Sequence, residues 1–132
     1  MKKLIALALV ILVASSCDPI AEYDAYIENA TPTNLSIAFF SSDIELNRSL
    51  NITSGQTVFF QEGSDIGSTF IQPSLVQYDS IVVRNEENQI IRVYKENDPG
   101  KNIYNVDAYW AGRETSKWVY EYEYQIESID LD

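Results

Sequence analysis

Histidine is absent from this 132-residue chain, and cysteine occurs once, as Cys17. Histidine is the usual general base near neutral pH and the commonest metal-binding side chain. A single cysteine cannot form a disulfide within the chain or build a multi-cysteine zinc site. These absences exclude Ser-His and Cys-His catalytic centres and cysteine-based metal sites, and they favour a non-enzymatic protein without a cofactor.

Basic residues are also scarce, with nine Lys and Arg against twenty Asp and Glu. Two of the nine, Lys2 and Lys3, lie at the very start of the chain, so residues 17–132 hold seven basic and twenty acidic residues, a net charge of −13. A chain this acidic repels phosphate backbones. It is therefore not expected to bind nucleic acid, and it offers no basic patch for anionic lipid headgroups.

The only long apolar run lies at the start of the chain. Lys2 and Lys3 precede an unbroken apolar stretch over residues 4–14, which leads into "ASSC" ending at Cys17. This layout is typical of a secretory signal peptide. The run is about half of the roughly 20 residues needed to span a bilayer. We therefore predict a cleaved signal peptide over residues 1–16.

The segment "ASSC" resembles the lipobox of bacterial lipoproteins, in which small residues precede the cysteine that becomes the mature N-terminus; Ala14 stands where that pattern most often has leucine. The resemblance implies that a diacylglyceryl group is attached to the Cys17 thiol, followed by cleavage before Cys17 and acylation of the new amine. Two or three acyl chains anchor stably, at about 0.8 kcal/mol per buried CH₂. An ordinary signal peptide with an incidental cysteine is the alternative. Residues 17–22 are expected to form a short tether.

The remaining sequence shows strand patterns and no sustained 3.6-residue periodicity. The expected strands cover residues 23–29, 34–41, 48–52, 57–61, 80–84, 90–95 and 117–127. Residues 48–52 and 57–61 are expected to form a hairpin around Gly55, and 80–84 and 90–95 a second one. Residues 62–78 are expected to be loop with a short edge strand near Phe70, and 96–117 a long loop with a helical turn near 101–104. These elements predict an all-β domain over residues 23–132, a single antiparallel β-sandwich of immunoglobulin-like or transthyretin-like type, with a small closed barrel as the alternative.

The clearest alternation lies in "KWVYEYEYQIE", residues 117–127. One face carries Trp118, Tyr120, Tyr122, Tyr124 and Ile126, and the other carries mostly glutamate. Buried aromatic rings commonly form such a row, so we interpret it as core, with stacking on sugar rings as the alternative.

Trp110, in the predicted loop 96–117, is the better candidate for an exposed contact. The candidate ligand-contact residues are therefore Trp110, Trp118 and Tyr120.

The acidic residues offer only weak site patterns. Glu121, Glu123 and Glu127 share one face of the last strand, and oxygen-rich clusters can hold Ca²⁺. A bare row of glutamates is more typical of a solvated strand face, so we predict no metal site. Two carboxylates facing one cleft could hydrolyse glycosides, which keeps a carboxylate-based hydrolase open as an alternative.

A looser resemblance covers most of the chain. The segments "YDAYIEN", "DSIVVRNEENQIIRVYKENDPGKNIYN" and "YEYEYQI" look like those of small lipoproteins of the Bacteroidota, which are of unassigned function and β-rich. This resemblance implies an outer-membrane address. "DSI" at residues 79–81 is similar to the Asp-Ser/Thr-apolar pattern that carries O-glycans in exported Bacteroidota proteins, which implies Ser80 as an acceptor; the simple start of a strand is the alternative.

Together these features predict a non-enzymatic β-domain, lipid-anchored to the outer membrane on its periplasmic or its surface side, that acts as a binding or structural accessory protein. Its expected partners are the membrane and an envelope protein or a glycan. The first alternative is a carbohydrate-binding lipoprotein associated with glycan uptake. The second is the carboxylate-based hydrolase.

Overall fold

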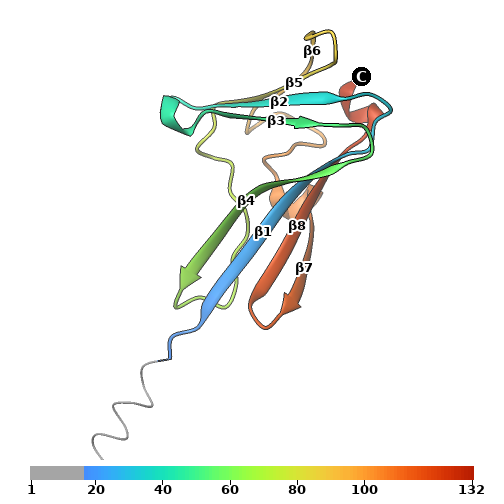
Figure 1. Ribbon diagram of the computed structural model, residues 1–132. Helices are drawn as coiled ribbons and strands as arrows, with labels where there is room; N and C mark the ends of the chain where they lie inside the picture. Colours follow the sequence, from blue (N-terminus) through green and yellow to red (C-terminus); the bar gives the residue numbers. More distant parts are fainter. Residues whose placement is uncertain (1–16) are drawn as a thin grey trace, which may run out of the picture.

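The domain is a β-sandwich of two four-stranded sheets, seen in a computed structural model that describes residues 17–132 (Figure 1). The predicted signal peptide, residues 1–16, lies outside the described residues. The strands are β1 (Ile20–Asn29), β2 (Leu35–Phe40), β3 (Arg48–Ile52), β4 (Thr57–Ile66), β5 (Ser80–Arg84), β6 (Ile90–Tyr94), β7 (Ala111–Ser116) and β8 (Val119–Ile126). Three short helices complete the described chain: η1 (Ile44–Leu46), α2 (Val106–Tyr109) and η2 (Ser128–Leu131). The predicted sandwich is therefore confirmed.

The first sheet has the order β4-β1-β8-β7 and is called here the long sheet; the second, β3-β2-β5-β6, is the short sheet. All neighbours are antiparallel except β1 and β8, the two central strands of the long sheet, which are parallel. In Figure 1 the short sheet covers one end of the long sheet, and the long strands run on past it toward the N-terminal end of the described chain. The two ends of the long sheet therefore have different surroundings.

The core lies where the two sheets face each other. Alternate residues of β1 and β2 point inward, which buries Ile27 from one sheet and Ile37 from the other. Phe39 of β2 stacks on Phe60 of β4 with ring centroids 4.9 Å apart, so an aromatic pair joins the sheets. Buried aromatic rings of this size contribute strongly to the hydrophobic stabilisation of the fold.

One predicted hairpin is confirmed and the other is wrong. β5 and β6 pair as predicted, but β3 pairs with β2 and β4 pairs with β1, so residues 53–56 carry the chain from one sheet to the other. Gly55 has a φ of 73° and its N–H donates to the carbonyl of Asn29, 2.8 Å away. The buried Asn29 amide donates in turn to the carbonyl of Ile52, 2.9 Å away. These hydrogen bonds fix the turn as a corner between sheets.

The predicted loops contain more strand than expected. β4 extends five residues further, to Ile66, and β7 forms an edge strand within the predicted loop 96–117. All six residues of β7 are exposed, so no apolar alternation marks the strand in the sequence. Phe70 lies in coil and not in an edge strand, and the helical turn is α2, five residues later than predicted.

The N-terminal tether is shorter than the predicted residues 17–22. β1 begins at Ile20, and residues 20–22 are already paired with β4. Glu22 also pairs with Val119 of β8. The ladder with β4 holds β1 from its first residue, which leaves residues 17–19 of the described chain ahead of the sheet.

Candidate functional site

Cys17, the predicted lipidation site, is exposed and lies immediately before the folded domain. Only Asp18 and Pro19 separate it from Ile20, the first residue of β1. The carbonyl of Pro19 accepts a hydrogen bond from the N–H of Gly67, 2.6 Å away, just beyond the end of β4. The chain is therefore tied to the long sheet within two residues of a solvent-accessible thiol.

Trp118 lies at the same end of the long sheet, in the turn between β7 and β8. Its φ of 63° is in the left-handed region, which is unusual for a bulky residue. Two hydrogen bonds hold its backbone: the N–H donates to Oε1 of Glu114 at 2.7 Å, and the carbonyl accepts from the N–H of Glu22 at 2.9 Å. The ammonium of Lys117 lies 4.3 Å from the centroid of the half-buried indole ring.

Trp110 is buried, contrary to its predicted exposure. Only 6 % of its surface is accessible, and its indole N–H donates to the carbonyl of Ile103 at 2.8 Å. Its ring packs against Phe60 at 6.1 Å and Tyr124 at 5.5 Å between centroids. Helix α2 ends directly before Trp110 and turns the side chain into the core, which a loop assignment could not reveal.

The aromatic row of β8 is mainly core, as interpreted from the sequence. Tyr122, Tyr124 and Ile126 are buried, and Tyr120 is half-buried. The hydroxyl of Tyr120 donates to the carbonyl of Thr69 at 2.7 Å, and that of Tyr122 to the carbonyl of Ile71 at 3.0 Å. The coil at residues 69–71 is thus held against the aromatic row of β8.

Glycines on both edge strands make room for a tyrosine ring on the neighbouring central strand. Gly63 of β4 is paired with Tyr23, and Gly112 of β7 is paired with Tyr122. A Cβ atom on Gly112 would lie 2.6 Å from Cε1 of Tyr122, and one on Gly63 would clash with the ring of Tyr23. The rings therefore lie flat over glycine, an arrangement in which an aromatic side chain shields a glycine-containing strand.

Beside this row a hollow of about 380 Å³ opens to solvent. Its lining includes Phe70, Gln72, Trp110, Arg113, Tyr120 and Tyr122, and we call it the aromatic hollow. Trp110 and Tyr120, two of the three predicted contact residues, therefore meet in one place, while Trp118 is not among the lining residues. Phe70 is 56 % exposed and stands edge-on to Tyr120 at 5.4 Å between ring centroids. The sequence pattern predicts a short edge strand near Phe70 and does not indicate a contact residue there, because nothing in an irregular coil marks such a role.

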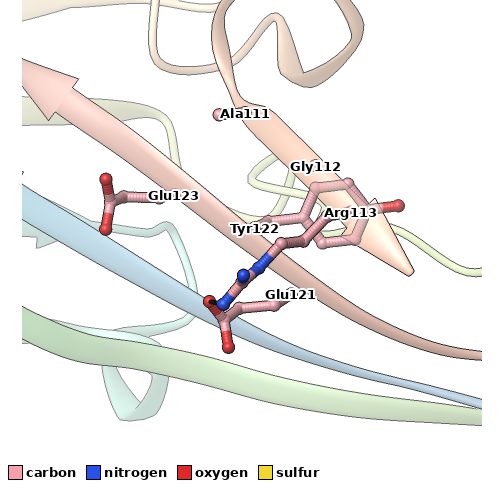
Figure 2. Close-up of a pocket in the computed structure, with 6 residues that line it drawn as sticks. All are labelled: Ala111, Gly112, Arg113, Glu121, Tyr122 and Glu123. Carbon is pink, nitrogen blue, oxygen red and sulfur yellow. Dashed lines mark hydrogen bonds and ion pairs between the residues drawn. The ribbon is translucent and has the colours of Figure 1, made fainter. Parts of the chain in front are cut away.

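The outer face of the long sheet is acidic. Glu121 pairs with Arg113 at 2.6 Å, and Figure 2 shows both with Glu123 among the residues that line a pocket of about 260 Å³, while the Tyr122 ring lies by Gly112. Partial burial raises the pKa of Glu123, and the charges of Glu28 and Glu121 raise it further.

No group of three or more acidic or cysteine side chains in the described residues is arranged to hold a metal ion. Glu127 does not continue the glutamate row of β8. It follows the strand and forms an ion pair with Lys101 at 3.3 Å.

Lys101 also contacts the buried carboxylate of Asp130 at 2.7 Å. Burial lowers the pKa of Lys101, but the hydrogen bonds and charges of Asp130 and Glu127 together raise it overall. This cluster holds η2 against the end of β8 and serves the fold.

Ser80, the predicted glycan acceptor, is the first residue of β5 and lies opposite Phe40 of β2. It is half-buried, and the preceding Asp79 accepts a hydrogen bond from the hydroxyl of Ser42 at 2.7 Å. The modification itself stays a prediction.

No protein-family model matches the chain, and no curated protein matches it either. Among residues 17–132, no helix is long and apolar enough to cross a membrane.

Proposed function

We propose that this protein is a lipid-anchored domain of the cell envelope, attached through Cys17 to the outer membrane, where it acts as a non-enzymatic binding or structural accessory protein. The observation that supports this most is the position of Cys17. It ends a lipobox-like segment, it is exposed, and only Asp18 and Pro19 separate it from β1. A membrane enzyme can reach such a thiol while the domain folds beyond it.

The non-enzymatic part of the proposal is supported by the chemistry of the exposed groups. The chain has no histidine, and Glu121 and Glu123 on the outer face of the long sheet are only half-buried. A general acid for glycoside hydrolysis needs a raised pKa inside a cleft that also holds a second carboxylate. Glu123 has a raised pKa, but the neighbouring carboxylate of Glu121 is held in an ion pair with Arg113.

Incorporation of labelled fatty acid tests the anchor. Cells expressing the natural chain are expected to label the protein, and cells expressing Cys17→Ser are expected not to. Equal label in both would refute the anchor at Cys17. Protease treatment of intact cells would then assign the domain to the surface or to the periplasmic side.

A second candidate function, carbohydrate binding, is favoured by the aromatic hollow. Phe70 and Tyr120 offer ring surface there, and the side-chain amide of Gln72 offers a hydrogen-bond donor close by. Small-ligand sites commonly combine a concave aromatic surface with a few polar groups. This arrangement suits the flat face and the hydroxyls of a sugar ring.

Two exposed phenylalanines allow a matched test. Phe70 packs edge-on against Tyr120 in the hollow, and Phe59, 47 % exposed, packs edge-on against Tyr26 on the outer face at 5.9 Å between centroids. On an array of plant, mucin and cell-wall polysaccharides, Phe70→Ala is expected to lose any binding that Phe59→Ala retains. Binding that survives Phe70→Ala, or no binding by the natural protein, would contradict the proposal for this hollow.

A further inference from the structure

Cys17 lies three residues before Ile20, the first residue of the long sheet. A lipid attached to Cys17 therefore keeps that end of the sheet close to the membrane. An extended chain spans at most about 3.5 Å per residue, so Cys17 and Ile20 are separated by no more than about 10 Å. The hydrogen bond from Gly67 to Pro19 and the fixed φ of proline stiffen even this short connection. An acyl chain on the Cys17 sulfur therefore brings the first residues of β1 to the level of the lipid headgroups.

Two isoleucines are exposed at this end. Ile20 and Ile66 are cross-strand partners at the last pair of the β1–β4 ladder, and they are 46 % and 73 % exposed. Directly opposed residues of an antiparallel pair project from the same face of the sheet. They form a small apolar surface beside the anchor, where water can be replaced by lipid.

Trp118 and Lys117 occupy the neighbouring turn. The N–H of Glu22, two residues after Ile20, donates to the carbonyl of Trp118, so the turn lies next to the start of β1 (Figure 1). A backbone with positive φ normally takes glycine or asparagine, and a bulky residue held there often marks a functional position. Tryptophan is favoured at the boundary between lipid and water, and a lysine beside it can extend its ammonium to the headgroups.

The distribution of charge favours a domain that contacts the membrane through the end of the long sheet over one that lies flat on the outer face of that sheet. Lys117 is accompanied by Asp18, Glu22 and Asp65, so the end is itself net negative, and its contact with lipid depends on Ile20, Ile66 and Trp118. The outer face of the long sheet is acidic over both of its central strands, with Glu22, Asp24, Glu28, Glu121 and Glu123. An anionic membrane surface repels that face, which opposes lying flat. Contact through the end of the sheet leaves it in water.

We infer that this end, defined by Ile20, Ile66, Lys117 and Trp118 and named the anchor end, rests on the bilayer and holds the domain upright. The inference deepens the proposed function and rests on the lipid at Cys17. The ten residues of β1 span about 33 Å at roughly 3.3 Å per residue. The short sheet and the C-terminus are therefore presented about 30 Å from the membrane, away from the anchor end.

Tryptophan fluorescence tests the inference in the lipidated protein itself. The full mature protein would be reconstituted into vesicles of phosphatidylethanolamine with brominated phosphatidylcholine, whose bromine atoms lie just below the headgroups. Quenching is expected in the natural protein and in Trp110→Phe, where Trp118 remains, and it is expected to disappear in Trp118→Phe, where only the buried Trp110 remains. Equal quenching in Trp118→Phe and the natural protein would refute the inference.

Flotation of the same vesicles separates the two proposals. Protein that does not float with the vesicles would refute the lipid anchor. Protein that floats but shows no quenching of Trp118 would retain the anchor and refute the docked anchor end.

Matched isoleucine variants test the apolar surface. Ile20→Ser/Ile66→Ser is expected to reduce the quenching of Trp118 by about two-fold or more, because less apolar surface is available to lipid. Ile44→Ser/Ile129→Ser changes two isoleucines that are each 78 % exposed on η1 and η2, and it is expected to leave the quenching unchanged. Equal quenching in both double variants would contradict a contact through the anchor end.

Discussion

Replacement of Gly112 by alanine is expected to destabilise the domain, because the new methyl group collides with the ring of Tyr122. The added Cβ would lie 2.6 Å from Cε1 and 2.9 Å from Cδ1 of Tyr122. Carbon atoms in contact normally lie about 3.5–4.0 Å apart. Gly112 is the second residue of β7 and its backbone is held by the ladder with β8, so we expect the ring to move.

The magnitude follows from what the displaced ring loses. The hydrogen bond from Tyr122 to the carbonyl of Ile71 contributes about 0.5–1.5 kcal/mol. The edge-to-face contact with Tyr23, at 6.1 Å between centroids, contributes about 0.5–1.5 kcal/mol. Alanine returns about 0.4–1 kcal/mol by restricting the unfolded chain. The expected net loss is about 1–2 kcal/mol, or roughly 4–8 °C in Tm.

Urea unfolding of Gly112→Ala, Tyr122→Leu and the double variant measures this loss. Leucine has no Cε1 and can rotate its Cδ atoms away from the new methyl group, so Gly112→Ala should cost less in the Tyr122→Leu background. A neutral or stabilising Gly112→Ala would refute the reasoning. So would an equal loss in both backgrounds, since the cause would then not be the ring.

Four further predictions concern the other aromatic and acidic residues. Trp110→Phe should lower the free energy of unfolding by about 2–3 kcal/mol in urea melts, because it leaves a cavity and an unpaired carbonyl. Trp118→Asn should change it by less than about 0.5 kcal/mol in the same melts, because asparagine suits the left-handed backbone there. Glu123→Gln should stabilise the domain at neutral pH by about 0.2–1 kcal/mol, the range for neighbouring charges in a sheet. Since the folded state raises the pKa of Glu123, this gain should shrink as the pH falls through that raised pKa and should vanish only below the ordinary pKa of an unfolded glutamate. Burial, with the charges of Asp79, Glu96 and Asp98, raises the pKa of Tyr104 to about 12. Stability should therefore fall as the pH rises from about 10 toward 12, and ultraviolet absorbance should show tyrosinate appearing together with unfolding.

Strands that carry alternating apolar residues could be predicted from the sequence. β8 and β2 each place large apolar side chains at every second position, and both were found within two residues of their predicted ends. β7 reads "AGRETS" and buries nothing. It exists because β8 offers a free edge, which is a property of the assembled sheet.

Strand pairing could not be read from local turns. Gly55 suggested a hairpin between β3 and β4, but the hydrogen bonds that decide its geometry involve Asn29, far away in the sequence. The parallel pairing of β1 with β8 joins the two ends of the domain and has no local signal at all.

The candidate sites also differ in whether they could be recognised from the sequence. Cys17 is recognisable from a continuous segment of sequence, whereas the aromatic hollow combines residues from α2, β7, β8 and the coil at Phe70. The exposure of Trp110 was wrongly predicted because its burial depends on packing against Phe60 and Tyr124, which come from two different strands.

Mass spectrometry of the N-terminal peptide of the membrane-extracted protein tests the central proposal most directly. We predict a peptide that begins at Cys17 and carries the mass of a diacylglyceryl group, alone or with one additional acyl chain. An unmodified Cys17, whether at the N-terminus or inside a longer peptide that retains residues before it, would contradict the lipid anchor.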